Sequence, residues 1–303
     1  MKTFNEINSK YSPTIESELK NAVHFKFKDS RQILIEAIQY SVMAGGKRIR
    51  PIICMAVEES LTNTIQNSQF IGVAIELIHC YSLIHDDLPS MDNDDFRRGQ
   101  PSCHKKFSES IAILAGDTLN TYAFEYLLDS LSFTIKPTLL IEIIKKFAVA
   151  CGINGMAGGQ CLDLLESNQS NNPQSNLQLN KIHKYKTGAV LEACFTIPAI
   201  VSHSTNETLS ILKRIGYHYG MLFQICDDIL DATASMNDIG KSPGKDLSQN
   251  KLTYVSHFGV NEAIKRAKEE YNQSIQLMKE IPLINDYISP IFSETLTKGI
   301  AHC

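Results

Sequence analysis

Apolar residues recur at every third or fourth position through most of the chain. One such series contains Phe70, Val73, Ala74, Leu77, Ile78 and Tyr81. This spacing places one apolar face on a helix. Comparable periodicity runs through residues 111–131, 139–151, 190–200, 209–230 and 271–279, whereas alternating polar and apolar runs of useful length are absent. The pattern predicts an all-α protein.

Several of these segments are too apolar for surface helices. Residues 221–229 have apolar side chains on more than one face, which is typical of the inner helices of a bundle. Residues 166–180 are instead rich in Asn, Ser and Gln and contain Pro173, so we expect a surface loop there. Because helical patterning continues on both sides of that loop, the sequence predicts one domain over residues 1–303.

Composition narrows the class of protein further. Of the 303 residues, 43% are hydrophobic and 20% are charged, and the net charge is -4. This balance excludes a disordered chain, and the absence of a basic run argues against nucleic-acid binding. No apolar stretch is long enough to span a membrane, and residues 1–20 do not resemble a signal peptide. We therefore expect a cytoplasmic protein.

The 8 cysteines form no C-x-x-C pair. Neither a zinc site nor a redox motif is therefore indicated. In a reducing compartment we expect free thiols that pack as small hydrophobic groups.

The most unusual chemistry follows the helix predicted before residue 88. Five aspartates lie within ten residues and two arginines follow them: Asp86, Asp87, Asp92, Asp94, Asp95, Arg97 and Arg98. Pro89 should end the helix near Asp87. Carboxylates are disfavoured at the negative end of a helix dipole, and a cation would relieve this repulsion. Oxygen-rich sites of this kind suit Mg²⁺, which also bridges to phosphate groups.

A second acidic cluster ends the apolar helix of residues 209–230. It contains Asp227, Asp228 and Asp231, and three lysines follow it at positions 241, 245 and 251. Asp227 and Asp231 are four residues apart and should share a helix face. Carboxylates that hold a metal, with ammonium groups beyond them, are what a metal-bridged diphosphate requires.

Each of these signals also has an ordinary structural explanation. One acidic cluster beside arginines is often a solvated helix end, although two such clusters after apolar helices are hard to explain in this way. The turn with Lys47 and Arg50 could simply start a helix, and His79 could be a core histidine. The segments 158–160 and 186–188 are weak signals when taken alone.

Together, six segments resemble the trans-isoprenyl diphosphate synthases, and most closely the bacterial farnesyl diphosphate synthases. They read GGKRIRP, HDDLPSMDNDDFRRG, GGQCLDL, KTGAV, FQICDDILD and GKSPGKDLSQNKLTY, and they span about Gly45 to Tyr254 in the family's order. The resemblance implies a bundle of long antiparallel helices around a deep cavity, usually as a homodimer. It also implies head-to-tail condensation of dimethylallyl or geranyl diphosphate with isopentenyl diphosphate, using three Mg²⁺ ions.

The resemblance assigns roles to individual residues. Asp86, Asp87 and Asp92 resemble metal ligands of the first motif, and Asp227 and Asp231 resemble those of the second. The residues that grip the allylic diphosphate are matched by Arg97, Lys186 and Lys241. The isopentenyl diphosphate pocket is matched by Lys47, Arg50, His79 and Arg98, and the path of the allylic cation by Thr187 and Gln224.

Product length should depend on the helix before the first motif. Tyr81 is the fifth residue before Asp86, with Ser82 beside it. A bulky ring there would close the cavity and stop chain growth near fifteen carbons, which favours farnesyl diphosphate. Tyr81 could instead only pack in the core, and geranylgeranyl diphosphate is the alternative product.

Three other functions would fit part of this pattern. A phosphohydrolase that binds metal through His85 and Asp86 would need further histidine ligands. A terpene cyclase should replace the second Asp motif with an Asn/Ser/Glu-type motif. A non-catalytic subunit should lack ligands in one motif, whereas both are intact in this sequence.

Overall fold

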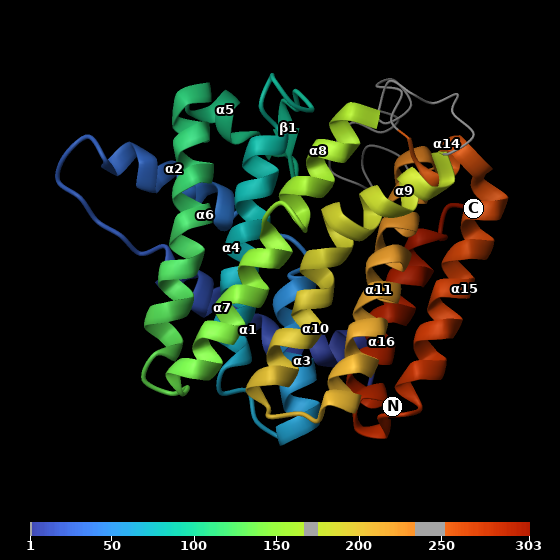
Figure 1. The fold of residues 1–303 in the computed structure, drawn as a ribbon. Coiled ribbons are helices and arrows are strands. Elements are labelled where there is room, and N and C mark those ends of the chain that lie inside the picture. The colour runs from blue at the N-terminus through green and yellow to red at the C-terminus, as the bar shows by residue number, and fades with distance from the viewer. Residues whose placement is uncertain (1, 167–174, 234–251) are drawn as a thin grey trace.

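The protein is built almost entirely from helices, as the sequence predicts (Figure 1). The computed structural model describes residues 2–166, 175–233 and 252–303. Its long elements run roughly parallel or antiparallel as a bundle. The helices are α1 (Phe4–Ala22), α2 (Gln32–Val42), α3 (Ile49–Thr62), α4 (Ser68–Asp86), α5 (Cys103–Lys106), α6 (Glu109–Leu131), α7 (Pro137–Cys151), α8 (Met156–Glu166), α9 (Ser175–His183), α10 (Ala189–Val201), α11 (Asn206–Thr233), α14 (Tyr254–Phe258), α15 (Val260–Met278) and α16 (Pro282–Gly299).

Two irregular features interrupt this bundle. A single turn of π-helix, η1 (Lys184–Gly188), joins α9 to α10. A short antiparallel hairpin, β1 (Phe96–Arg97) and β2 (Gln100–Pro101), follows α4. Both features carry residues of the predicted site, and π-turns within helices often occur at functional sites.

The predicted loop over residues 166–180 is wrong at both ends, because Glu166 is the last residue of α8 and residues 175–180 belong to α9. Leu179 and Ile182 lie on its buried side, and their spacing of three residues gives the segment the apolar face that a helix needs. The Asn-rich composition concealed this face. Residues 167–174 lie outside the part of the chain that the structure describes.

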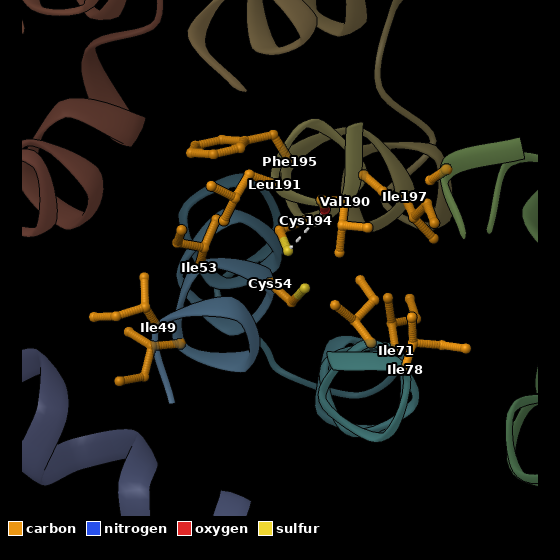
Figure 2. Close-up of a cluster of buried hydrophobic side chains, with 14 of the residues drawn as sticks. Ile49, Ile53, Cys54, Ile71, Ile78, Val190, Leu191, Cys194, Phe195 and Ile197 are labelled. Atoms are coloured by element: carbon orange, nitrogen blue, oxygen red, sulfur yellow. Dashed lines mark hydrogen bonds between the residues drawn. The ribbon is translucent and has the colours of Figure 1, made fainter. Parts of the chain in front are cut away.

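The core of the bundle lies where α3, α4 and α10 meet (Figure 2). Ile53 on α3, Ile78 on α4 and Leu191 on α10 are completely buried there. Cys54 and Cys194 lie among them, and burial raises the pKa of the Cys54 thiol well above its ordinary value. Such a thiol is unreactive and fills space as a small apolar group.

Six of the cysteines are buried, as expected, but Cys161 and Cys303 are exposed. The expectation of buried thiols is therefore wrong at these two positions. Cys161 lies on the exposed side of α8, away from the buried Met156, Gly159 and Asp163.

The packing order brings the two Asp-rich segments to one end of the molecule. α4 packs on α3, α3 on α10 and α10 on α11. The hairpin that follows α4 and the helix α14, which comes after α11 in the chain, both lie at the upper end in Figure 1. The residues at the ends of α4 and α11 can therefore face the same space.

Among the described residues, no helix combines the length and the apolarity that crossing a membrane requires.

Candidate active site

One cavity, with a volume of about 380 Å³, collects most of the predicted site residues. Its walls come from α4 and the segment after it, and from α8, η1 and α11. The predicted residues that line it are Arg50, His79, Tyr81, Ser82, Asp86, Asp92, Arg97, Lys186, Thr187, Gln224 and Asp227. The tertiary structure thus brings together residues that are separated by up to 177 positions in the sequence.

The first acidic cluster folds back onto the end of its helix. α4 ends at Asp86, as Pro89 predicts. The amide of Asp92 donates a hydrogen bond to the carbonyl oxygen of Asp86 over 2.9 Å, and the amide of Asp94 donates to that of Asp87 over 3.1 Å. These bonds use carbonyls at the helix end that lack helical partners. They also carry Asp92 to the same cavity wall as Asp86.

The charged form of Asp86 is disfavoured at this wall. Burial, together with the nearby charge of Asp92, raises the pKa of Asp86 to about 6, although Lys186 acts in the opposite direction. A carboxylate with a raised pKa in a cavity is a candidate functional group. A bound cation would favour the charged carboxylate and so oppose this shift.

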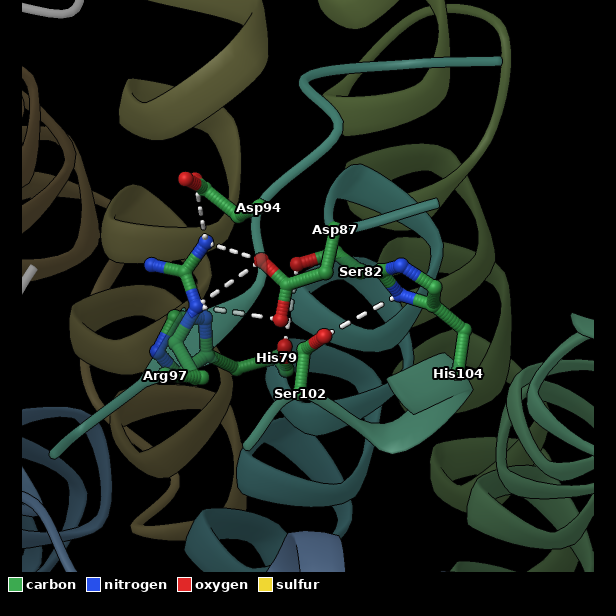
Figure 3. A network of polar contacts seen from close by, with 7 residues as sticks. All are labelled: His79, Ser82, Asp87, Asp94, Arg97, Ser102 and His104. Carbon is green, nitrogen blue, oxygen red and sulfur yellow. Dashed lines mark hydrogen bonds and ion pairs between the residues drawn. The ribbon is translucent and has the colours of Figure 1, made fainter. Parts of the chain in front are cut away.

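Asp87 is not among the residues that line the cavity, and it pairs with Arg97 (Figure 3). Its carboxylate accepts hydrogen bonds from Nε of Arg97 at 3.0 and 3.2 Å, and Nη2 of Arg97 also contacts it. Nη2 lies 3.5 Å from Oδ2 of Asp94 as well. The two carboxylates hold Arg97 at the cavity, where it was expected to grip a diphosphate. Asp87 itself borders a smaller hollow behind the hairpin.

Lys186 reaches the cavity from the π-turn. Its Nζ lies 2.6 Å from Oδ2 of Asp163 on α8. Burial alone would lower the pKa of Lys186, but Asp163 and Asp86 outweigh it, so the pKa is raised and the ammonium stays charged. Gly159 allows this approach, because a Cβ there would lie 2.0 Å from the backbone nitrogen of Lys186.

Asp163 was not singled out by sequence reasoning. It lies within the segment GGQCLDL, where one carboxylate in an apolar helix is a weak signal. Only the packing of α8 against η1 shows that it faces Lys186.

A chain of hydrogen bonds connects η1, α11 and α14. The hydroxyl of Thr187 donates to Oε1 of Gln224 over 2.8 Å, and Nε2 of Gln224 donates to Oδ1 of Asp228 over 2.9 Å. The amide of Tyr254 donates to Oδ2 of Asp228 over 2.8 Å. The chain sets the orientation of the Gln224 amide, with its oxygen toward Thr187.

The second acidic cluster divides its aspartates between different environments. Asp227 is exposed and lines the cavity, and Asp228 is buried and lines it as well. Asp231, which was expected to support Asp227, is buried on α11 and is not among the cavity-lining residues. The four-residue spacing predicts that Asp227 and Asp231 share a helix face. In the structure only Asp227 lines the cavity, and Asp231 is buried on α11.

The predicted isopentenyl diphosphate pocket is assembled only in part. Arg50 and His79 line the cavity, and the buried Nε of Arg50 has no hydrogen-bond partner among the described residues. Arg98 donates from Nη1 to the carbonyl oxygen of Gly45, and Lys47 is exposed outside the cavity. Lys241 lies outside the described residues, as do the lysines at 245 and 251.

The donor set fits a hard cation shared with an anion. Within the described ranges, no group of three or more His, Cys, Asp or Glu side chains converges closely enough to hold an ion alone. Mg²⁺ is typically held by one or two carboxylates, with water and substrate phosphates completing its coordination. Asp86 and Asp92 on one wall and Asp227 on another suit this type of site.

Gln160 lies in the segment 158–160, which was a weak signal in the sequence. It lines the cavity from α8, and both polar atoms of its buried amide are without a partner in the described structure. Buried polar groups normally have hydrogen-bond partners, so this amide marks space where a polar ligand can bind.

His183 is the last residue of α9 and lines the cavity next to η1. Burial, with a smaller contribution from Lys186, lowers the pKa of this histidine to about 3 from the ordinary 6.5. The folded state therefore excludes a proton that the unfolded chain binds. The stability from this group is complete above pH 6.5 and is lost as the pH falls toward 3.

We expect His183→Asn to flatten the fall in unfolding free energy between pH 6.5 and 4, as measured by urea titration without metal. His302→Asn, at an exposed position, serves as the control and should follow the wild type. Parallel curves for wild type and His183→Asn would contradict the assignment. At each pH the variant is compared with the wild type. The unfolding free energy also has a contribution of opposite slope from Asp86 below pH 6, and this contribution is common to both proteins.

Comparison with known proteins agrees with this geometry. Residues 31–287 match the family model described as polyprenyl synthetase. The chain is 38% identical over 268 residues to a farnesyl diphosphate synthase of Micrococcus luteus, covering 88% of this chain and 90% of that one. It is 38% identical over 265 residues to a chloroplastic geranylgeranyl pyrophosphate synthase of Capsicum annuum, covering 85% and 71%.

A solved structure is similar over nearly the whole length. It is a geranyltransferase of Helicobacter pylori in complex with magnesium and isoprenyl diphosphate. The TM-score is 0.84 at 32% identity, with 96% of this chain and 98% of that one covered. The expected all-helical fold is confirmed by this likeness as well as by the helices themselves.

Proposed function

Because this chain belongs to the polyprenyl synthetase family, we propose that it condenses dimethylallyl or geranyl diphosphate with isopentenyl diphosphate to make farnesyl diphosphate. The observation that carries the proposal is that Asp86, Asp92 and Asp227 line one cavity together with Lys186. In this proposal residues 1–303 form a single catalytic domain.

Mg²⁺ is the proposed cofactor, with three ions per site. Asp86 and Asp92 would hold it on the α4 wall and Asp227 on the α11 wall. Asp87 and Asp231, the other expected ligands, are not among the cavity-lining residues, and Asp87 instead holds Arg97. When bound, Mg²⁺ neutralises the charge that develops on the departing diphosphate, a contribution of several kcal/mol. The phosphohydrolase alternative fits less well, because it needs His85 as a metal ligand, whereas Nε2 of His85 lies 3.1 Å from the carbonyl oxygen of Ile113 on α6.

Lys186 and Arg97 supply fixed positive charge for the allylic diphosphate, and Lys241 is proposed to join them. Lys186 is held by Asp163, and Arg97 by Asp87 and Asp94, so neither cation must be reorganised when charge moves onto the leaving group. Preorganised charge of this kind stabilises a transition state more than the ground state.

The allylic cation formed on C–O cleavage requires oxygen atoms close by and no water. Thr187 and Gln224 line the cavity, and the hydrogen bond between their side chains fixes their relative orientation. The double bond of isopentenyl diphosphate then attacks the cation. We propose that the diphosphate released in the first step accepts the proton that leaves the new carbon chain.

Isopentenyl diphosphate is proposed to bind at Arg50 and His79, with Lys47 and Arg98 completing the pocket. Burial and the charge of Arg50 lower the pKa of His79 well below its ordinary value. His79 is therefore neutral, and it would contact the diphosphate through a hydrogen bond. Arg50 would supply the charge, using an Nε that now has no partner within the described chain.

The decisive experiment is product analysis of the purified protein. Dimethylallyl and isopentenyl diphosphate are supplied with Mg²⁺, and the released prenyl alcohols are separated by chain length after phosphatase treatment. We expect C15 to predominate and diphosphate release to stop on chelation with EDTA. A main product of C20 would support the geranylgeranyl alternative, which relatives such as the Capsicum annuum enzyme favour. Absence of any condensation would contradict both.

Tyr81 is proposed to close the cavity at the C15 stage. It lines the cavity from α4, and the neighbouring Ser82 donates a hydrogen bond to the carbonyl oxygen of His79 over 2.9 Å. Tyr81→Ala should lengthen the product to C20 or beyond in the same assay. Tyr81→Phe keeps the ring and serves as the control, which should retain C15. An unchanged product in Tyr81→Ala would refute the role of the ring.

We also propose that the protein is a homodimer. α6 and α7 lie at one edge of the bundle (Figure 1). They expose large apolar side chains there: Leu128 is 41% exposed, Ile141 69% and Val149 49%. Phe133, between these helices, is 95% exposed. Apolar surface of this kind is typical of an interface, and a second copy of this chain is its proposed partner.

A further inference from the structure

His85 precedes the first metal-ligand candidate but turns its ring toward a different helix. Its Nε2 lies 3.1 Å from the carbonyl oxygen of Ile113 on α6. Because a carbonyl only accepts, Nε2 must carry the hydrogen. The ring also lies directly over Gly116, where a Cβ would come within 2.1 Å of Nε2. His85 is thus anchored to α6 by a hydrogen bond and by close packing.

The anchored ring supports Tyr81. The two residues are four apart on α4 and therefore share a helix face. Their ring centroids are 5.5 Å apart with an interplanar angle of 87°, which is an edge-to-face contact. Both residues line the cavity. In the described structure the Tyr81 side chain makes no hydrogen bond of its own, so its orientation depends on packing.

We propose that His85 is a positioning residue for product length, which holds the ring of Tyr81 across the cavity by tying it to α6. The inference rests on the proposed function and on Tyr81 as the cavity floor. A growing prenyl chain presses against this ring, and without the imidazole the ring can turn aside. Asp117 lies 3.8 Å from Nε2 but is largely exposed, so its charge is not part of the support.

Three variants separate the parts of this arrangement. His85→Ala removes both the anchor and the ring, and His85→Gln can still donate to Ile113 but lacks the ring. Gly116→Ala displaces the imidazole from α6. In the product assay, each should raise the C20 to C15 ratio by about two- to tenfold, the range expected from one aromatic contact. Asp117→Asn is the control and should leave the ratio unchanged.

Combination with Tyr81→Ala tests whether His85 acts through Tyr81. If it does, His85→Ala should change the product ratio of Tyr81→Ala by less than about twofold, because the group it supports is absent. A full further increase in the double variant would overturn the inference. The inference would also be overturned if His85→Gln lowered the rate of condensation while the C20 to C15 ratio stayed at the wild-type value. His85 would then act on Asp86 rather than on Tyr81.

The result also distinguishes failure of the inference from failure of the proposed function. Longer products from Tyr81→Ala, with no change in the His85 variants, would leave the cavity floor intact and reject the role of His85. Unchanged products from Tyr81→Ala would reject the floor and the inference together. Absence of condensation by the wild-type protein would reject the proposed function itself.

Discussion

Asp86→Ala and Asp227→Ala are each expected to lower kcat by about a thousandfold while leaving the helical content unchanged. Removing a ligand of the leaving-group metal forfeits several kcal/mol of transition-state stabilisation, which is a loss of this size. Turnover is measured as diphosphate release from dimethylallyl and isopentenyl diphosphate at saturating Mg²⁺, with circular dichroism as the check on folding.

Asp95→Ala is the matched control for Asp86→Ala. Asp95 belongs to the same acidic segment, but its side chain is 58% exposed and pairs with Lys105 at 2.8 Å. Its loss should change kcat by less than about twofold, because Asp95 is not among the cavity-lining residues. Near-normal turnover in either Asp86→Ala or Asp227→Ala would contradict the assigned roles.

Replacing Asp86 should also change the stability of the metal-free protein. The raised pKa of Asp86 means that its charged form is disfavoured in the folded, metal-free protein. The stabilising effect of that raised pKa is complete below about pH 3.8 and is lost as the pH rises through 6. At pH 8 without Mg²⁺, Asp86→Asn should therefore be more stable than the wild type, a gain that thermal unfolding can detect.

The second large effect is expected at a buried ion pair between the start of α3 and α4. Nη1 of Arg48 lies 2.9 Å from Oε1 of Glu76, and both side chains are 2% exposed. Arg48 also donates to Glu16 and to the carbonyl oxygen of Val42, each over 2.8 Å. It thereby closes the loop that precedes α3 and carries Lys47.

Arg48→Met or Glu76→Leu alone should reduce the unfolding free energy by about 3–5 kcal/mol, because each removes one member of an ion pair that is buried on both sides. The double variant should recover most of this loss. Asp29→Ala is the control, since Asp29 and Arg31 form a pair at 2.7 Å whose side chains are 56% and 64% exposed. Its effect should stay below about 1 kcal/mol. Urea unfolding measures all four, and a loss under 1 kcal/mol in both single variants would contradict the prediction.

The all-helical fold was accessible from the sequence because it depends on local patterning. The period of the apolar residues predicted α4, α6, α7, α10 and α11, and Pro89 predicted the end of α4 at the first motif. The error at α9 has the same origin. This helix has few apolar residues, and its Asn-rich composition is typical of a loop. Only the structure shows that Leu179 and Ile182 are buried.

The sequence predicted the chemistry of the site but not which side chains face the cavity. Carboxylates after apolar helices indicated a cation and an anion, and most of the candidates line one cavity. Which carboxylate faces the cavity depends on helix rotation and on side-chain pairing. Asp87 pairs with Arg97, and Asp231 is buried on α11, although neither is distinguishable from its neighbours by residue type.

By itself, the sequence determined that this chain forms helices, where two acidic segments end them, and to which family it belongs, because periodicity and ordered motifs are properties of the chain alone. Only the tertiary structure decided that Asp163 holds Lys186, that Arg48 is paired with Glu76, and that His85 rests on α6 beside Tyr81. The partners in the first two pairs, and His85 and its acceptor Ile113, are 23 or 28 positions apart. Their meeting depends on how whole helices pack, and no local pattern encodes that packing.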